Sequence, residues 1–214
     1  MYVPAPPVTP LAGFEPPGFK ASAPRGEPAI SALRVRTRSR HVLAGHPVSV
    51  RGRLIAGGSS TSLPGRTVVL QMLGRRWATV AHARTAVSGG FLLRFVPRHI
   101  GSARLRVRFA GEHGVLLASR RRIGRLNVYR PVQASWYGGA GSLACGGRLT
   151  SATMGVANRT LPCGTLVTLH LGSRTVRVPV VDRGPFVGAR EFDLTSATRQ
   201  ALGFGDTGEI WSTV

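Results

Sequence analysis

The segment from residue 180 to residue 195, with the sequence VVDRGPFVGAREFDLT, constrains the fold most strongly. An apolar run typical of a buried strand ends at Asp182, and a turn rich in glycine and proline then forces the chain off the strand path. The segment closes on Asp193, eleven residues after Asp182. A short helical pattern follows over residues 195–202 and stops at a glycine. The sequence thus predicts one loop flanked by two carboxylates, with the second at the start of a helix.

Arginine dominates the charge of the chain and is unevenly distributed. The 214 residues contain 29 lysines and arginines against eight acids, which gives a formal net charge of +21. Residues 1–130 hold 22 of the basic residues and three acids, whereas residues 131–214 hold seven basic residues and five acids. A field of that sign concentrates polyanions such as nucleic acid, teichoic-type wall polymers or anionic lipid surfaces. The alternative is an arginine usage that only reflects the base composition of the genome.

The sequence carries no visible signal for membrane insertion or export. No apolar run approaches the roughly 18 residues that a membrane-spanning helix needs. The first 20 residues lack both the basic region and the apolar region of a signal peptide. Two options stay open: an intracellular protein, or a start that lies downstream of the true export signal.

Residues 1–130 divide into a leader and a β-rich domain. Residues 1–29 contain eight prolines without strand or helix periodicity, which predicts an extended leader. Residues 30–130 contain seven short apolar runs separated by turn signals, which predicts an immunoglobulin-like β-sandwich. The runs cover residues 32–37, 47–55, 66–73, 77–83, 91–96, 103–109 and 123–129. The region shows no nucleophile, metal-ligand spacing or phosphate-binding loop, so we expect a binding or spacing module.

One predicted strand of this domain alternates arginine with apolar residues. In the sequence RLRVRF of residues 104–109, Arg104, Arg106 and Arg108 share one face. Residues 33–38 repeat the pattern. The row is either a polyanion-binding surface or a solvated sheet face whose like charges discourage edge-to-edge pairing.

Residues 131–214 differ in character, because acids appear, arginine becomes rarer and glycine-rich turns multiply. Strand-like runs cover residues 132–137, 153–157, 165–171, 175–181 and 208–213. With the helix after Asp193, they predict a compact, mostly β barrel with one or two short helices. Three of the five acids of this domain, Asp182, Glu191 and Asp193, lie in or beside the segment from 180 to 195. We therefore place the chemistry there.

The chain has two cysteines, Cys145 and Cys163. Two cysteines without a histidine and cysteine cluster argue against a structural zinc site. They are either two buried thiols or one disulfide, and their position beside glycine in polar turns favours the disulfide. A disulfide would require an oxidising compartment. No metal or organic cofactor is indicated.

Three blocks of this domain are distinctive. They are ASWYG at residues 134–138, NRTLPCGT at residues 158–165, and DRGPF at residues 182–186 followed by DLT at residues 193–195. In this order they resemble the rare lipoprotein A (RlpA) family. That family folds as a six-stranded double-psi β-barrel, shared with expansins and some lytic transglycosylases, so the resemblance implies this barrel for residues 131–214. In some members a disulfide bridges the turns that hold Cys145 and Cys163, which supports export to the cell wall or the extracellular space.

The resemblance also implies a function. Barrels of this family act on peptidoglycan glycan strands. In a lytic transglycosylase one acid protonates the glycosidic oxygen and then, as a carboxylate, takes the proton of the sugar's C6 hydroxyl, which closes a 1,6-anhydro ring. By resemblance to expansins and barrel-type transglycosylases, Asp193 matches the indispensable aspartate and Asp182 its upstream partner. Glycan binding needs aromatic platforms and polar contacts. The candidates are Trp136, Tyr137, Asn158, Arg183 and Phe186.

A structural interpretation of both carboxylates competes with the catalytic one. Asp193 would anchor the start of the helix, where free N–H groups and the helix dipole favour a carboxylate. Asp182 would accept hydrogen bonds in the turn and pair with Arg183 or Arg190.

The sequence departs from the family at three positions. RlpA members that cleave glycan usually carry glutamate, aspartate and histidine where this chain has Gly147, Thr150 and Asn158. The departure favours a non-catalytic, expansin-like peptidoglycan-binding module, whereas the retained Asp182 and Asp193 favour a transglycosylase. An arginine-rich nucleic-acid-binding protein is disfavoured, because the charge lies on a separate domain without a nucleic-acid motif. The predicted partners are peptidoglycan glycan strands and anionic wall polymers.

Overall fold

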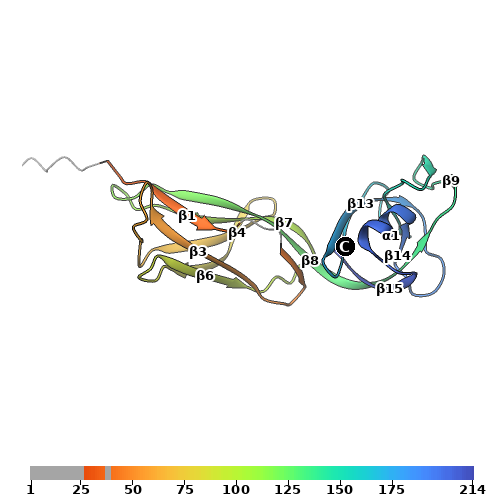
Figure 1. Cartoon of the computed structure of the whole chain (residues 1–214), viewed down its shortest axis with the longest axis horizontal. Coiled ribbons are helices and arrows are strands. Elements are labelled where there is room, and N and C mark those ends of the chain that lie inside the picture. The colour runs from red at the N-terminus through yellow and green to blue at the C-terminus, as the bar shows by residue number, and fades with distance from the viewer. Residues whose placement is uncertain (1–26, 37–39) are drawn as a thin grey trace, which may run out of the picture.

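The computed structural model describes residues 27–36 and 40–214. Most of the predicted leader, and the end of the first arginine-rich run at residues 37 and 38, lie outside the described residues. The described chain is mostly β-structure and forms two parts placed end to end (Figure 1). One long strand, β8 (Ser119–Tyr137), runs from the first part into the second.

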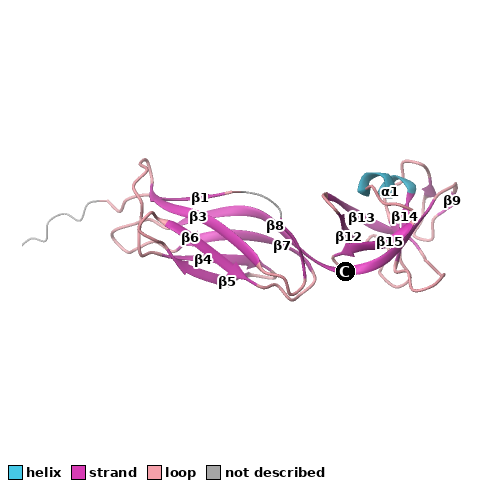
Figure 2. Cartoon of the chain, turned by 60° about the horizontal axis from the view of Figure 1, so that its bottom comes forward, coloured by secondary structure: helices cyan, strands magenta, loops and turns pink. Residues whose placement is uncertain are grey.

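The first part consists of two sheets packed face to face (Figure 2). One sheet has the order β1-β3-β6, with β1 (Ser31–Val35), β3 (Val48–Ala56) and β6 (Gly90–Phe95). The other has the order β2-β8-β7-β4-β5, with β2 (Arg40–Leu43), β7 (Gly101–Phe109), β4 (Thr67–Leu73) and β5 (Trp77–Arg84). Apolar side chains from alternate strand positions fill the space between the sheets. They include Val50, Leu54, Leu70, Leu93, Leu105, Val107 and Leu126.

Each of the seven runs predicted in this part overlaps a strand of the structure. The sequence missed β2, whose four residues RHVL carry two polar side chains and no strand alternation. β2 pairs in parallel with β8 at the end of the sheet that faces the barrel. The immunoglobulin-like assignment of the two sheets stays a prediction.

Six strands of the second part close into a ring. The ring runs from β8 through β14 (Phe192–Thr195), β11 (Val156–Ala157), β13 (Arg174–Asp182), β12 (Leu166–Leu171) and β15 (Thr207–Ser212) back to β8. The pairings β8–β14 and β11–β13 are parallel, and the other four are antiparallel. Buried side chains of all six strands form the barrel core, among them Val132, Val156, Leu169, Val178, Leu194 and Ile210. The expected six-stranded barrel is therefore present.

The second part also contains a small hairpin and a short helix, neither of which belongs to the ring. A small hairpin joins β9 (Gly141–Ser142) to β10 (Arg148–Leu149). The single helix of the described residues, α1 (Ser196–Leu202), follows β14 and ends at Gly203, which adopts the left-handed conformation with φ of 66°. The helix stop was thus predicted correctly.

The helix begins where the sequence pattern placed it, but Asp193 does not belong to its start. Thr195 is the N-cap, and its side chain accepts a hydrogen bond from the N–H of Thr198. Asp193 belongs to β14 instead, between the buried side chains of Phe192 and Leu194. The expectation that Asp193 anchors the helix was wrong, because an alternating strand pattern of four residues precedes the helical one.

Strand β8 changes its partners between the two parts. It pairs with β7 and β2 up to Tyr129 and with β15 from Arg130 onwards. At this point the rings of His41 from β2 and His170 from β12 stack with 4.8 Å between their centroids, beside the fully buried Tyr129. Nδ1 of His41 lies 2.7 Å from the hydroxyl of Tyr129. The domain boundary predicted after residue 130 thus falls within a continuous strand, and it stays a prediction.

No helix of the described residues is long and apolar enough to cross a membrane.

Candidate functional site

The barrel brings the two predicted carboxylates onto strands separated by one other strand. Ala157 of β11 pairs with Asp182 of β13 on one side and with Asp193 of β14 on the other. Two strand spacings put the Cα atoms of the aspartates about 10 Å apart. The loop of residues 183–191 connects β13 to β14. The predicted loop between the two carboxylates is therefore present.

Asp193 is held by a serine from the neighbouring strand. Ser135 of β8 pairs with Asp193 in the parallel β8–β14 ladder, and its hydroxyl donates a hydrogen bond to Oδ1 of Asp193. Oδ2 of Asp193 faces the loop, because a Cβ added to Gly184 would lie 3.9 Å from it. Ser135 is 5% exposed, whereas Asp193 is partly exposed. One carboxylate oxygen is thus fixed from inside the barrel and the other borders the loop.

Asp182 is held by backbone donors rather than by a cation. Its Oδ1 accepts hydrogen bonds from the N–H groups of Ala144 and Arg183, each at 2.9 Å. In the described residues no ion pair joins it to an arginine. The predicted pairing of Asp182 with the Arg183 or Arg190 side chain was wrong, since both guanidinium groups donate to backbone carbonyls instead.

Arg183 uses its guanidinium to fix a neighbouring loop. Nη1 donates to the carbonyls of Asn158 at 3.1 Å and Leu161 at 2.9 Å, and Nη2 lies 3.1 Å from Sγ of Cys163. The side chain that the sequence proposed as a substrate contact is therefore engaged within the protein.

Tyr137 lies in the field of both carboxylates. It follows Ser135 by two positions on β8, and burial together with the charges of Asp182 and Asp193 raises the pKa of its hydroxyl. The hydroxyl is buried and has no partner at hydrogen-bonding geometry, so its interaction with the nearby Asp182 is mainly electrostatic. The site thus contains a phenol that stays protonated between two acids.

The two predicted aromatic platforms differ in access. The guanidinium of Arg199 covers Trp136 at 4.1 Å from the ring centroid, and the indole N–H donates to Asp206 at 3.0 Å. Phe186, by contrast, projects from the loop after Asp182 and is 77% exposed, and its neighbour Val187 is 66% exposed. Phe186 is therefore the more open platform beside the carboxylates.

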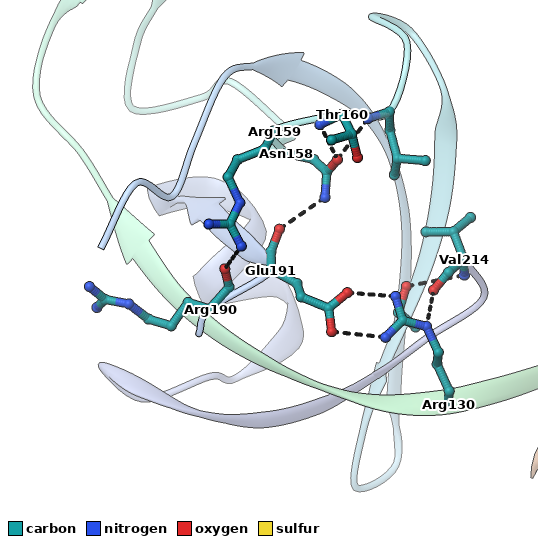
Figure 3. A network of polar contacts seen from close by, with 9 residues as sticks. Arg130, Asn158, Arg159, Thr160, Arg190, Glu191 and Val214 are labelled. Carbon is teal, nitrogen blue, oxygen red and sulfur yellow. Dashed lines mark hydrogen bonds and ion pairs between the residues drawn. The ribbon is translucent and has the colours of Figure 1, made fainter. Parts of the chain in front are cut away.

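Asn158 is buried, and its side-chain polar atoms bond within the protein (Figure 3). Its Oδ1 accepts from the N–H groups of Thr160 at 3.1 Å and Leu161 at 2.8 Å, and its Nδ2 donates to the carbonyl of Glu191 at 2.9 Å. Asn158 therefore connects the end of β11 to the end of the loop of residues 183–191.

Glu191 anchors the same loop end to β8, which the sequence did not reveal. Arg130 donates to both of its carboxylate oxygens, at 2.8 and 2.6 Å, and donates from Nε to the carbonyl of Val214 (Figure 3). The hydrogen bonds from Arg130 hold the pKa of Glu191 below its usual value. The loop is thus fastened at its far end by a bidentate pair that also holds the C-terminal residue.

A disulfide between Cys145 and Cys163, with 5.5 Å between the Cα atoms, fastens the other side of the site. The N–H of Cys145 also donates to the carbonyl of Val181 at 3.2 Å. The bridge joins the turn that supplies the Ala144 N–H to the loop that Arg183 holds. The predicted disulfide is confirmed.

The three positions that depart from the family carry no acid or base. Gly147 is exposed, has a φ of 82° and faces open space. Thr150 is exposed, and its hydroxyl lies 3.0 Å from that of Thr153. Among the side chains that contact the two aspartates, the sequence analysis missed Ser135. The sequence indicated it only as a small hydroxyl residue within the block ASWYG.

The predicted polyanion-binding arginines lie in the other part of the molecule. Arg104, Arg106 and Arg108 lie on β7, in the five-stranded sheet, and not in the barrel. No group of three or more His, Cys, Asp or Glu side chains in the described part of the chain is placed to hold a metal ion.

Comparisons with known proteins concern the barrel. The sequence profile of a family described as lytic transglycolase matches residues 130–211. The chain is 36% identical over 107 residues to the probable endolytic peptidoglycan transglycosylase RlpA of Aquifex aeolicus, covering 48% of this chain and 47% of the relative. It is 39% identical over 80 residues to the protein of the same name from Synechocystis sp., covering 35% of this chain and 25% of the relative.

A third relative is the endolytic peptidoglycan transglycosylase RlpA of Neisseria meningitidis serogroup A, which is 41% identical over 80 residues, covering 35% of this chain and 34% of the relative. The chain thus spans about half or less of the length of these relatives. The matched segment coincides with the six-stranded ring and contains both aspartates. Residues 130–211 of this chain therefore form an RlpA-like double-psi β-barrel.

Proposed function

We propose that the barrel remodels peptidoglycan by cleaving glycan strands as a lytic transglycosylase, with Asp193 as the reacting acid and base. The observation that carries the proposal is the meeting of Asp193, Asp182 and the protonated Tyr137 at one end of the barrel. The names of the relatives, endolytic peptidoglycan transglycosylases, supply the substrate class.

One carboxyl group suffices for the reaction. Protonated Asp193 gives its proton to the glycosidic oxygen, and the bond from that oxygen to C1 breaks. The resulting carboxylate then takes the proton of the C6 hydroxyl while the C6 oxygen bonds to C1, which yields a 1,6-anhydro end and returns Asp193 to its protonated form. Ser135 acts as a positioning residue, since its hydroxyl fixes Oδ1 of Asp193 and leaves Oδ2 toward the loop.

Asp182 and Tyr137 provide the electrostatic environment of the reaction. The transition state resembles an oxocarbenium ion with positive charge at C1. A carboxylate already oriented by two backbone N–H groups stabilises such charge without reorganising. Tyr137 keeps its proton and can donate a hydrogen bond to a sugar oxygen or to either aspartate.

The loop of residues 183–191 supplies the sugar-binding surface in this proposal. The exposed ring of Phe186 offers an apolar platform of the kind that sugars stack on. Asn158 and Arg183 act from behind the loop as positioning residues, because their polar groups bond within the protein. We place the protein in the cell wall or outside the cell, since its disulfide requires an oxidising compartment.

The test is the release of soluble fragments from purified peptidoglycan sacculi. Wild type is compared with Asp193→Asn and with Glu209→Gln, a matched carboxyl-to-amide control at an exposed position of β15. We expect release by wild type and by the control, and a loss of at least about 100-fold in Asp193→Asn. Equal release by all three proteins would remove Asp193 from the reaction.

The second candidate function is a binding module without catalysis. Gly147, Thr150 and Asn158 favour it, because the ionisable groups usual at these positions in glycan-cleaving members are missing. In that case wild type and Asp193→Asn both sediment with sacculi, and neither releases fragments.

A further inference from the structure

A dense array of arginines covers the outer face of the five-stranded sheet. Three lie on β7 and three on β8, and they face each other as the cross-strand pairs Arg104–Arg125, Arg106–Arg122 and Arg108–Arg120. Four of the six, at positions 104, 108, 120 and 122, are exposed, and the other two are partly exposed. We call this set the arginine ladder.

The arginine ladder has no carboxylate to neutralise it. The acids of the described residues before the barrel are Glu27 and Glu112, and Glu112 pairs with Arg66 at 2.6 Å. No ion pair of the described residues involves a member of the ladder. Like charges directly opposite each other on a sheet are destabilising. Burial and the charges of Arg120, Arg108 and Arg122 accordingly lower the pKa of Arg106.

The spacing of the ladder suits a chain of repeated phosphates. Arg104, Arg106 and Arg108 recur about every 7 Å along β7, and the two strands lie about 5 Å apart. A bulge in the pairing places Arg125 of β8 three residues after Arg122 and keeps it opposite Arg104. The ladder thus presents three pairs of guanidinium groups along two neighbouring strands of the sheet. Guanidinium binds phosphate oxygens in a bidentate manner, which a regular row can repeat along a flexible polymer.

Neighbouring side chains distinguish between polyanions. Trp77 lies beside the ladder, but the guanidinium of Arg106 covers its ring at 4.1 Å, and Nε of Arg106 also donates to Gln71 at 2.8 Å. Single-stranded nucleic acids bind through free aromatic rings on which bases stack. Sequence readout of a duplex requires an element that enters a groove, whereas β7 and β8 lie within a five-stranded sheet.

We propose that the arginine ladder binds a polyol phosphate polymer of the teichoic type. The binding surface lies on the part of the molecule that does not contain the barrel site, so it is independent of whether the barrel cleaves glycan. Its effect would be to hold the barrel close to anionic wall polymers. Binding of a polyanion would also relieve the repulsion within the ladder and stabilise the folded protein.

The experiment measures binding of poly(glycerol phosphate) chains, freed of lipid, to the full protein over a range of salt concentrations. The first variant carries Arg104→Ser, Arg106→Ser and Arg108→Ser, and the second carries Arg120→Ser, Arg122→Ser and Arg125→Ser. The control has the same change in charge on the opposite sheet, through serine at the exposed positions Arg34, Arg51 and Arg94. Thermal unfolding checks that each variant is folded.

We expect each ladder variant to lose about tenfold or more in affinity at about 0.15 M salt, and its logarithmic salt slope to fall by about 2 to 3. The control should stay within about threefold of wild type. Equal losses in ladder and control variants would show that net charge alone binds the polymer, and would overturn the proposal. Equally tight binding of single-stranded DNA, duplex DNA or anionic vesicles at the same phosphate concentration would overturn the assignment of the partner.

Discussion

Ser135 is the residue on which the geometry of Asp193 depends. Its hydroxyl comes from the adjacent strand and donates to Oδ1 of Asp193, and the strand register places the two residues opposite each other. A hydrogen bond to a charged group contributes about 1.5–3 kcal/mol. The barrel therefore orients the carboxyl group of Asp193 by pairing two strand residues that lie 58 positions apart in sequence.

We predict that Ser135→Ala lowers the rate of fragment release about tenfold to 100-fold, because Asp193 loses its fixed orientation. Ser135→Thr, which keeps a hydroxyl, should recover part of that loss. The measurement is the initial rate on sacculi at saturating substrate, with circular dichroism as a control for folding. An unchanged rate in Ser135→Ala would show that Asp193 needs no such support.

Asn158 tests whether a position that differs from the family has become structural. We predict that Asn158→Ala destabilises the protein by about 1–3 kcal/mol, because two N–H groups and the carbonyl of Glu191 lose their partner. Urea denaturation measures the change. Unaltered stability together with weaker sedimentation on sacculi would instead make Asn158 a substrate contact.

The sequence predicted some of these residues and not others, for a physical reason. Asp182 and Asp193 lie in one short motif, so their spacing along the chain carries the signal. Asn158 bonds to Glu191, 33 residues away in sequence, and Glu191 bonds to Arg130, 61 residues away. These residues come together only when the strands close into the ring. The exposure of the Trp136 ring could not be predicted either, since the side chain that covers it, Arg199, comes from the helix.

The disulfide is the device that holds the elements around Asp182. It links the turn after β9 to the loop before β12, and these two segments share no strand pairing. We predict that the double variant Cys145→Ser, Cys163→Ser is less stable by about 3 kcal/mol, in line with the 18-residue separation that the bridge spans. Urea denaturation with and without reductant checks this: reductant should destabilise wild type and leave the variant unchanged. An insensitive wild type would contradict the prediction.

At the level of elements, long alternating patterns were read correctly and short ones were not. β14 has four residues, and the helical pattern that begins at its end concealed it. The strands β9 and β10 have two residues each, which is too few for a periodic signal. β11 also has two residues, and the predicted run of residues 153–157 contained it but was too long. These short strands are set by ring closure and tertiary contacts rather than by local preference.

At the scale of the whole molecule, we expect the stability of the junction between the two parts to depend on pH. Partial burial lowers the pKa of His41 and of His170, and the charge of His170 lowers that of His41 further. Both rings therefore favour the neutral form in the stacked arrangement, and the separated state binds more protons below about pH 6.5. The contribution of the stack is complete above that pH and is lost as the pH falls below it.

We predict that His41→Phe, which keeps the ring and cannot be protonated, reduces the loss of thermal stability between about pH 7.5 and pH 5.5. His113→Phe at an exposed position serves as the control and should behave as wild type. Small-angle scattering at both pH values tests whether the two parts separate. A pH dependence that is the same in His41→Phe and wild type would exclude the junction as its source.

The most direct test of the central claim is the chemistry of the new glycan ends. Peptide-stripped glycan strands are incubated with wild type or with Asp193→Asn, and mass spectrometry determines the ends formed. Cleavage through Asp193 predicts 1,6-anhydro ends with wild type and none with the variant. Ordinary reducing ends would contradict the transglycosylase route, and intact strands with both proteins would show that the barrel binds glycan without cleaving it.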